Sequence, residues 1–314
     1  MSNPYQAILL IAFGGPTAPE GIRPFLARVT SGIPIPSERL EEVAHHYEAV
    51  GGKSPLNEIT FRQAGALQTL LNARGKRLPV YVGMRNSPPF FAETLKQMAN
   101  DGVRNALGFI LSSHRTEASW ERYQKNIADA RAEVGSNGPA VDYCDGWHDH
   151  PLFIQSWVEL IESAFTQIVP DRRSSTPLIF TAHSLPTAMA ARSLYVEQLN
   201  TSARMIADKL GHPYWSLAYQ SRSGKPTDPW LEPDIGNALR KLAAEGRKEV
   251  IVAPIGFVCD HVEVLYDLDV EARRIAKDLN LNMVRANCPN DDPTFISMIA
   301  DVIEQKMQRA ENRR

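Results

Sequence analysis

Eight short apolar runs recur along the chain, and longer amphipathic stretches separate them. Each run is apolar at nearly every position rather than at alternate ones, which is typical of strands buried on both faces of a parallel sheet. Strands that alternate with helices indicate an α/β fold. The runs span residues 7–13, 80–84, 106–111, 140–144, 178–182, 215–219, 250–255 and 282–285, and the helix-like stretches include 55–72, 88–100, 116–134 and 187–210.

The runs divide evenly along the sequence, with four before residue 150 and four after residue 175. A chain of 314 residues also has the length of two domains of about 150 residues each. The polar, proline-containing segment 169–177 is typical of a connection. We therefore predict two similar α/β domains, residues 1–150 and 151–314, with a ligand cleft between them. As an alternative, the C-terminal helix of the second domain packs on the first domain.

The charge balance is nearly neutral, with 34 Lys and Arg against 36 Asp and Glu. It favours neither nucleic acid nor an anionic membrane surface as a partner. No apolar run approaches the roughly 20 residues of a membrane-spanning helix, and no secretory signal is visible. The three cysteines are too few for a four-thiolate zinc or iron–sulfur site and form no C-x-x-C pair. We therefore expect a cytoplasmic protein with no integral membrane segment.

Ligands of a parallel sheet bind beyond the carboxyl ends of its strands, so the residues that follow each run are the candidates for a site. The glycines of segment 13–16 allow close backbone approach, but their spacing does not match G-x-G-x-x-G, and a plain tight turn accounts for them. His183 follows the run 178–182. A neutral imidazole there can bind a metal or act as a base near neutral pH, and a structural histidine bonded to nearby backbone is an equal alternative.

An acidic row follows the run 250–255, on a segment that we expect to be helical. Glu263, Asp267 and Glu271 have the spacing i, i+4, i+8 and therefore share one helix face, where like charges repel. A solvated acidic face is the commoner reason for such a row. This row, however, begins just beyond a strand end and has apolar neighbours, so it could hold or conduct a divalent cation. The residues alone predict a metal-handling cleft without identifying its substrate.

Six segments, taken in chain order, resemble the ferrochelatase family, whose members insert ferrous iron into a porphyrin. The last two segments are the most specific, and together the six cover most of the chain. The resemblance is to the short, soluble type that acts on coproporphyrin III and lacks a C-terminal iron–sulfur extension. The matching segments are 9–16, 46–56, 181–186, 219–222, 228–234 and 254–269.

The resemblance implies two Rossmann-like domains, each with a mostly parallel four-stranded sheet flanked by helices, and a porphyrin in the cleft between them. It implies that His183 and Glu263 form the catalytic pair on the metal side and that Asp267 and Glu271 continue an acidic row of metal-binding residues. We hypothesise that one member of the pair accepts a pyrrole proton while the other presents iron. The porphyrin-binding positions that the resemblance implies are Phe13, Thr30, His46, Tyr47, Ser54 and Tyr123.

Two of these positions depart from the family. Phe13 stands where many short members have a tyrosine near the iron, so no axial ligand is available from that side chain. Thr30 stands where several relatives have a basic residue that contacts a propionate, and Arg28 is a candidate to replace it. These departures bear on how the porphyrin is bound more than on the expected metal-side pair of His183 and Glu263.

The resemblance also sets expectations for cofactors and partners. Ferrous iron is expected as a substrate, without an iron–sulfur cluster, and the porphyrin is the expected binding partner. We expect a monomer, with a transient contact to a haem-accepting enzyme as an option. Three alternatives stay open: a non-catalytic tetrapyrrole carrier, a chelatase for another metal or ring, and protoporphyrin IX as the substrate.

Overall fold

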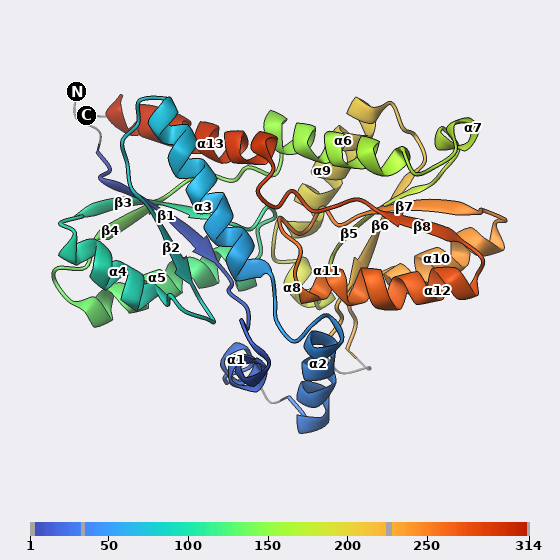
Figure 1. The fold of residues 1–314 in the computed structure, drawn as a ribbon, viewed down its shortest axis with the longest axis horizontal. Helices are drawn as coiled ribbons and strands as arrows, with labels where there is room; N and C mark the ends of the chain where they lie inside the picture. Colours follow the sequence, from blue (N-terminus) through green and yellow to red (C-terminus); the bar gives the residue numbers. More distant parts are fainter. Residues whose placement is uncertain (1–3, 33–34, 224–227, 313–314) are drawn as a thin grey trace. The chain divides into compact units, whose positions relative to one another are not determined.

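The computed structural model describes residues 4–32, 35–223 and 228–312. The chain divides into two compact units. Unit 1 takes the chain up to Ser112, residues Glu117–Trp147 and the chain from Asp291 onward; unit 2 takes Ser113–Thr116 and His148–Asn290. Each unit contains one four-stranded sheet in which all pairs are parallel (Figure 1), which confirms the predicted α/β fold with two similar halves. The residues from Asp291 onward, which lie within the expected second domain 151–314, cluster with unit 1.

The sheet of unit 1 has the strand order β2-β1-β3-β4. All six residues of β1 are buried, as expected for a central strand with helices on both of its faces. The pair α3 and α13 covers one face of the sheet, and the pair α4 and α5 covers the other (Figure 1). The elements are β1 (Ala7–Ala12), α3 (Leu56–Ala73), β2 (Val80–Met84), α4 (Phe91–Asn100), β3 (Asn105–Ile110), α5 (Arg122–Val134), β4 (Ala140–Tyr143) and α13 (Pro293–Glu311).

Three short elements join β1 to α3 in unit 1, and one precedes α5. They are the 3₁₀ turn η1 (Pro19–Gly21), α1 (Ile22–Val29), α2 (Ser37–Ala49) and the π-helical segment η2 (Glu117–Glu121). Helices α1 and α2 pack against each other. Helix α13 starts sharply, because the Asp292 carboxylate accepts the N–H groups of Thr294 and Phe295 while Pro293 occupies the first turn.

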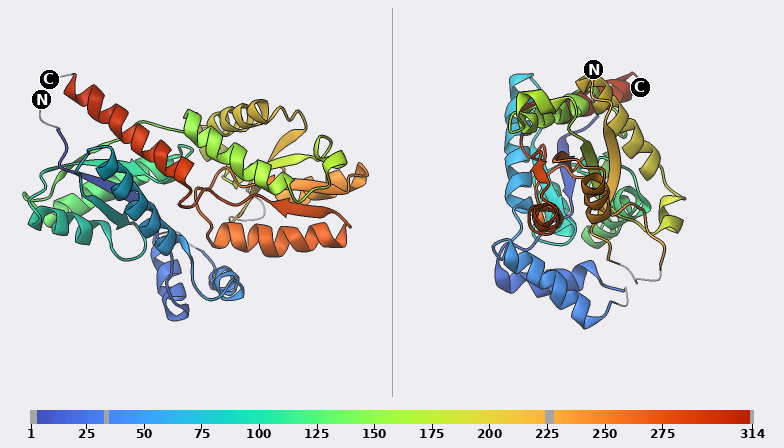
Figure 2. Two further views of the ribbon diagram at one scale, coloured as in Figure 1. Left: turned by 45° about the horizontal axis from the view of Figure 1, so that its top comes forward. Right: turned by 90° about the vertical axis from the view of Figure 1, so that its right-hand side faces the viewer.

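The sheet of unit 2 repeats the same relative strand order, β6-β5-β7-β8. Helices α6 and α9 pack together on one side of it, and α10 and α12 pack together on the other (Figures 1 and 2). The main elements are α6 (Pro151–Phe165), β5 (Leu178–His183), α9 (Tyr195–Leu210), β6 (Trp215–Gln220), α10 (Ile235–Ala244), β7 (Glu249–Ala253), α12 (Arg273–Asp278) and β8 (Asn282–Arg285). Shorter ones are α7 (Pro170–Arg173), α8 (Thr187–Ala190), α11 (Val262–Leu265) and the π-helical segment η3 (Asp267–Ala272).

The strand order of each sheet reverses at one point, between β1 and β3 in unit 1 and between β5 and β7 in unit 2. In open α/β sheets the crevice at such a reversal, beyond the carboxyl ends of the strands, is where ligands bind. The segments that leave β5 and β7 therefore start from the position where a ligand site is expected in unit 2.

Two expected helices are wrong in detail. The stretch 187–210 is two helices, α8 and α9, and the second begins where the Ser193 hydroxyl accepts the N–H of Tyr195. The stretch that follows β7 is a loop as far as His261, whose extended backbone and accepting Nδ1 atom cap α11. Helix α11 then passes through π-helical turns into α12, so the expected regular helix is interrupted.

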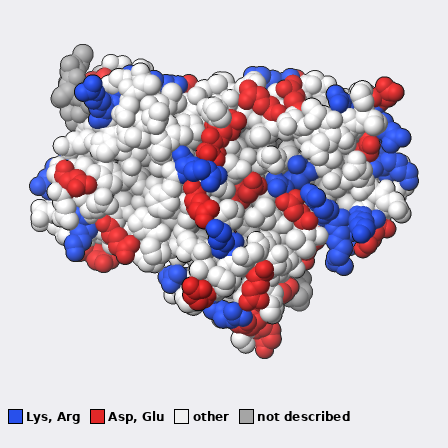
Figure 3. Space-filling view, in the orientation of Figure 1, with Lys and Arg blue, Asp and Glu red and all other residues white. Residues whose placement is uncertain are grey.

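The surface carries charges of both signs, as the near-neutral composition predicts. Both basic and acidic side chains are spread over the face drawn in Figure 3, and basic ones gather toward its right-hand side. Within the described part of the chain, no helix combines the length and the apolar character that a membrane crossing requires.

Candidate functional site

His183 and Glu263 lie side by side at the reversal point of the unit 2 sheet. His183 is the last residue of β5, and Glu263 lies in the first turn of α11, which follows β7. The Nε2 atom of His183 is 3.7 Å from Oε1 of Glu263. The two side chains are 30% and 37% exposed, so each keeps a face toward solvent or a ligand. The structure thus brings together the two residues that the sequence analysis pairs.

The backbone around His183 fixes which nitrogen of its ring is available. Nδ1 lies 2.5 Å from the carbonyl oxygen of Ser184. Because a carbonyl can only accept, Nδ1 carries the hydrogen, and a neutral imidazole then has its lone pair on Nε2. The 3.7 Å separation from Glu263 is too long for a hydrogen bond. Nε2 can therefore take a proton or a cation beside the carboxylate.

The end of β5 is held in place by two neighbours. The Tyr195 hydroxyl donates to the carbonyl oxygen of His183 at 3.0 Å, and burial raises the pKa of Tyr195 well above its usual value, so this hydroxyl stays a donor. Gly256 donates its N–H to Thr181 at 3.0 Å. A Cβ on Gly256 would lie 2.6 Å from the Cβ of Ala182, so only glycine lets the loop after β7 cross β5 at this point.

Gln220 connects both halves of the pair. It is the β6 partner of His183 in the sheet register, and its side-chain Nε2 donates to the backbone carbonyl of Glu263. The side chain is 1% exposed, and its Oε1 is buried without a hydrogen-bond partner among the described residues. Since a carbonyl cannot donate, this contact fixes the orientation of the amide. Sequence reasoning missed Gln220; the available signal is that it ends a strand next to β5.

The acidic row begins at Glu263, and its exposure increases along the chain. Asp267 accepts the hydroxyl of Ser221, a residue with the left-handed φ of 62°. Glu263 and Asp267 are half-buried, and Glu271 is exposed. The N–H of Glu271 bonds to the carbonyl of Tyr266, five residues back, so the expected regular i, i+4, i+8 face is wrong. Such π-helical turns occur frequently at functional sites.

His261, two residues before Glu263, makes contacts within its own segment. The Nδ1 atom of His261 accepts the N–H of Glu263 at 3.2 Å, and its ring packs edge-on against Phe257 with centroids 4.9 Å apart. Burial lowers the pKa of His261, so its neutral form is favoured. Among the described residues, no group of three or more His, Cys, Asp and Glu side chains gathers as a metal-binding cluster.

The aromatic positions expected to contact a porphyrin lie in unit 1. Phe13 directly follows β1 and is 37% exposed. The buried Phe25 ring packs edge-on against both Phe13, at 6.2 Å between centroids, and Tyr47, at 5.9 Å. The backbone N–H of Ser54 donates to Pro16 at 2.8 Å, and this joins the segment before α3 to the turn after β1.

The remaining expected positions have other surroundings in unit 1. The Thr30 hydroxyl donates to the carbonyl of Leu26 at 2.8 Å, at the end of α1. The Tyr123 ring is buried and packs edge-on against Phe91, with centroids 6.4 Å apart. His46 is half-buried on α2, and burial, followed by the nearby charge of Arg39, lowers its pKa.

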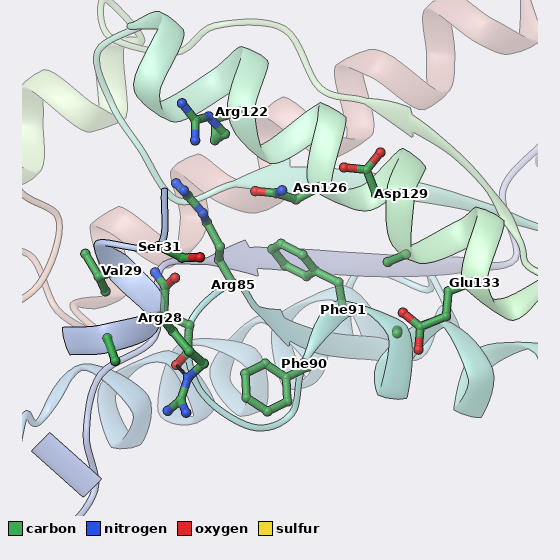
Figure 4. Close-up of a pocket in the computed structure, with 14 residues that line it drawn as sticks. Arg28, Val29, Ser31, Arg85, Phe90, Phe91, Arg122, Asn126, Asp129 and Glu133 are labelled. Carbon is green, nitrogen blue, oxygen red and sulfur yellow. Dashed lines mark hydrogen bonds between the residues drawn. The ribbon is translucent and has the colours of Figure 1, made fainter. Parts of the chain in front are cut away.

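Unit 1 also contains a pocket that sequence reasoning missed. It has a volume of about 700 Å³ and lies among the end of α1, the loop after β2, the start of α4 and one face of α5 (Figure 4). Three arginines, Arg28, Arg85 and Arg122, line it. The available signal was the position of Arg85, which immediately follows the run 80–84 at the carboxyl end of a strand.

Comparison with known protein families gives one match along nearly the whole chain. The model of the family described as Ferrochelatase matches residues 5–307. The chain is 40% identical over 313 residues to the coproporphyrin III ferrochelatase of Mycolicibacterium smegmatis, covering 99% of this chain and 92% of that protein. It is 42% identical over 304 residues to the coproporphyrin III ferrochelatase of Mycobacterium leprae, covering 96% and 89%. It is 40% identical over 305 residues to a ferrochelatase of Rhodopirellula baltica, covering 97% and 87%.

Solved structures with a similar fold include two of a chelatase from Bacillus subtilis. The structure described as SirB with Fe³⁺ has a TM-score of 0.61, at 9% identity and 98% coverage of both chains. The sirohydrochlorin chelatase SirB in complex with cobalt has a TM-score of 0.57, at 10% identity and coverage of 98% and 97%. At this identity the similarity establishes the fold.

Proposed function

Because this chain belongs to the ferrochelatase family, we propose that it inserts ferrous iron into coproporphyrin III in haem biosynthesis. The family match covers nearly the whole chain and supports a metal chelatase acting on a porphyrin. The choice of porphyrin rests on relatives of 40% and 42% identity that are named for coproporphyrin III. The observation that carries the mechanism is the 3.7 Å approach of His183 and Glu263.

Insertion exchanges two pyrrole protons for one Fe²⁺ ion. Each N–H bond breaks with its electron pair left on nitrogen, and both protons have to leave the ring. In our proposal the Nε2 lone pair of His183 accepts each proton in turn, since Nδ1 is already committed to Ser184. The Glu263 carboxylate, whose Oε1 lies 3.7 Å from Nε2, stabilises the imidazolium that forms.

The acidic row then gives the protons a route to solvent. Glu263 and Asp267 are half-buried and Glu271 is exposed, so the three carboxylates lead from the pair to the surface. The same carboxylates could carry incoming iron to the pair, because hard oxygen ligands bind ferrous iron weakly enough to release it. In this scheme Gln220 and Tyr195 are positioning residues, since they contact the backbone of Glu263 and His183.

We also propose that the protein is a cytoplasmic monomer that releases the iron coproporphyrin to an acceptor enzyme. Cys144, Cys259 and Cys288 are buried and unpaired, as expected in a reducing compartment. Three thiols are also too few to hold an iron–sulfur cluster by cysteine alone, so iron enters this proposal only as a substrate.

The test mixes the full chain with coproporphyrin III and ferrous iron under anaerobic conditions and follows the absorbance change. We expect insertion faster than in a blank that contains the double variant H183A/E263Q, and faster with coproporphyrin III than with protoporphyrin IX. Tight porphyrin binding without faster insertion would instead identify a carrier. Faster insertion of cobalt or nickel than of iron would identify a chelatase for another metal.

A further inference from the structure

The pocket of unit 1 has a basic end that is not neutralised. Arg85 extends toward Arg122 at this end of the pocket, and Arg28 lies near the loop that carries Arg85 (Figure 4). Within the described part of the chain, the guanidinium groups of Arg85 and Arg122 form no hydrogen bond or ion pair, whereas Arg28 donates to the carbonyl of Asn86 at 3.0 Å. Two cations that converge in this way form a site for an anion.

Burial makes the charge of Arg85 costly in the absence of an anion. Arg85 is half-buried. Burial, with the nearby charge of Arg122, lowers its pKa, so the surroundings disfavour its charged form. The Phe13 ring, whose centroid lies 6.0 Å from the Arg85 guanidinium carbon, is the aromatic neighbour of this group. An anion bound between the two arginines would remove their mutual repulsion.

The opposite end of the pocket is acidic. Asp129 and Glu133 project from the same face of α5 as Arg122, two and three turns further along (Figure 4). Asp129 is paired with Lys125 at 2.7 Å and so does not neutralise the arginines. Between the two ends, the Asn126 side chain lines the pocket, and its buried Oδ1 has no hydrogen-bond partner among the described residues. A ligand is therefore oriented, with its negative group at the arginines.

We propose that Arg85 and Arg122 form a binding site for a carboxylate group. Planar guanidinium groups match a carboxylate through paired N–H···O bonds, and the pocket of about 700 Å³ has room for the group and the chain that carries it. The carboxylate has two chemical sources: a propionate of the porphyrin, which rests on the function proposed above, or a free small carboxylate such as citrate.

The test measures binding separately from insertion. The double variant R85Q/R122Q is compared with the wild type and with the control K96Q, which removes a cation from an exposed position of α4. Coproporphyrin III and protoporphyrin IX are titrated by fluorescence quenching, and citrate and inorganic phosphate by calorimetry. Iron insertion by the wild type is measured in parallel.

If the source is a propionate, the Kd for coproporphyrin III rises at least about tenfold in R85Q/R122Q, because charge-assisted hydrogen bonds are lost. The value for K96Q stays within about twofold of the wild type, as usual for an exposed charge. If the ligand is instead a free small carboxylate, citrate binds the wild type and not R85Q/R122Q, and the two proteins have the same affinity for coproporphyrin III. Unchanged affinity for both ligands overturns the proposal, as does phosphate binding as tight as that of the carboxylates. Absence of insertion by the wild type would contradict only the function proposed above, since the citrate titration still tests the site.

Discussion

Gln220 pairs with His183 in the register of β5 and β6, and its side chain reaches the backbone of the residue that faces His183. One buried amide thus ties the end of a strand to the first turn of α11. We therefore expect this connection to help set the separation of the imidazole and the carboxylate.

Replacement of Gln220 by methionine tests this connection. Q220M keeps the volume but removes the donor to the Glu263 carbonyl, so we expect kcat for iron insertion to fall at least about tenfold, with KM nearly unchanged, because reacting groups are displaced. The exposed Gln97→Met serves as the control. A kcat equal to that of the wild type in folded Q220M would show that the amide does not position the pair.

Ser221 combines a left-handed backbone with a hydrogen bond to Asp267. S221A loses the hydroxyl donor and keeps the strained backbone, so we expect it to be less stable by about 1 kcal/mol. S221G also loses the donor, but glycine adopts a positive φ readily, so we expect it to be more stable than S221A by about 1 kcal/mol. Urea unfolding of the three proteins measures both differences. Equal stability of S221A and S221G would contradict the assignment of backbone strain.

His114 predicts a loss of stability in acid. Its ring nitrogens lie 2.8 Å from the Ser113 hydroxyl and 3.0 Å from that of Ser202, and burial lowers the pKa of His114 to about 3. In the unfolded chain the His114 imidazole is therefore protonated as the pH falls below 6.5, whereas in the folded chain it stays neutral down to about pH 3. Between these values this residue alone lowers the free energy of unfolding by about 1.4 kcal/mol for each unit of decreasing pH.

The measurement is urea unfolding of the wild type and of H114Q from pH 7.5 to 4.5. We expect H114Q to be less stable at pH 7.5 but to lose stability less steeply as the pH falls. Parallel pH profiles for the two proteins would show that His114 is not held neutral in the folded state.

The strands could be predicted from the sequence because burial on both faces leaves a continuous apolar run. All eight expected runs are strands, and the completely buried β1 shows why the pattern is so clear. The break between α8 and α9 could not be predicted, since it depends on the capping contact of a single serine. The π-helical turns of η3 depend equally on tertiary contacts, among them the hydrogen bond from Ser221 to Asp267.

The site could be predicted only in part. His183 and Glu263 follow strand ends, and the topology of parallel sheets places such positions together. Gln220 also ends a strand, but it acts through a backbone carbonyl, and no sequence pattern shows that contact. Arg122 lies on the surface of a long helix and follows no strand end. Their contacts come from the packing of segments that are distant in the sequence.

The central claim is that His183 and Glu263 together carry out iron insertion, and the most direct test is the insertion rate of E263Q into coproporphyrin III under anaerobic conditions. Glutamine keeps the size of the side chain and removes its charge and basicity, so we expect a rate about 10²- to 10⁴-fold below that of the wild type, with porphyrin still bound. The control E162Q, at an exposed position of α6, should retain the wild-type rate. A folded E263Q that binds porphyrin and inserts iron at nearly the wild-type rate would contradict the claim.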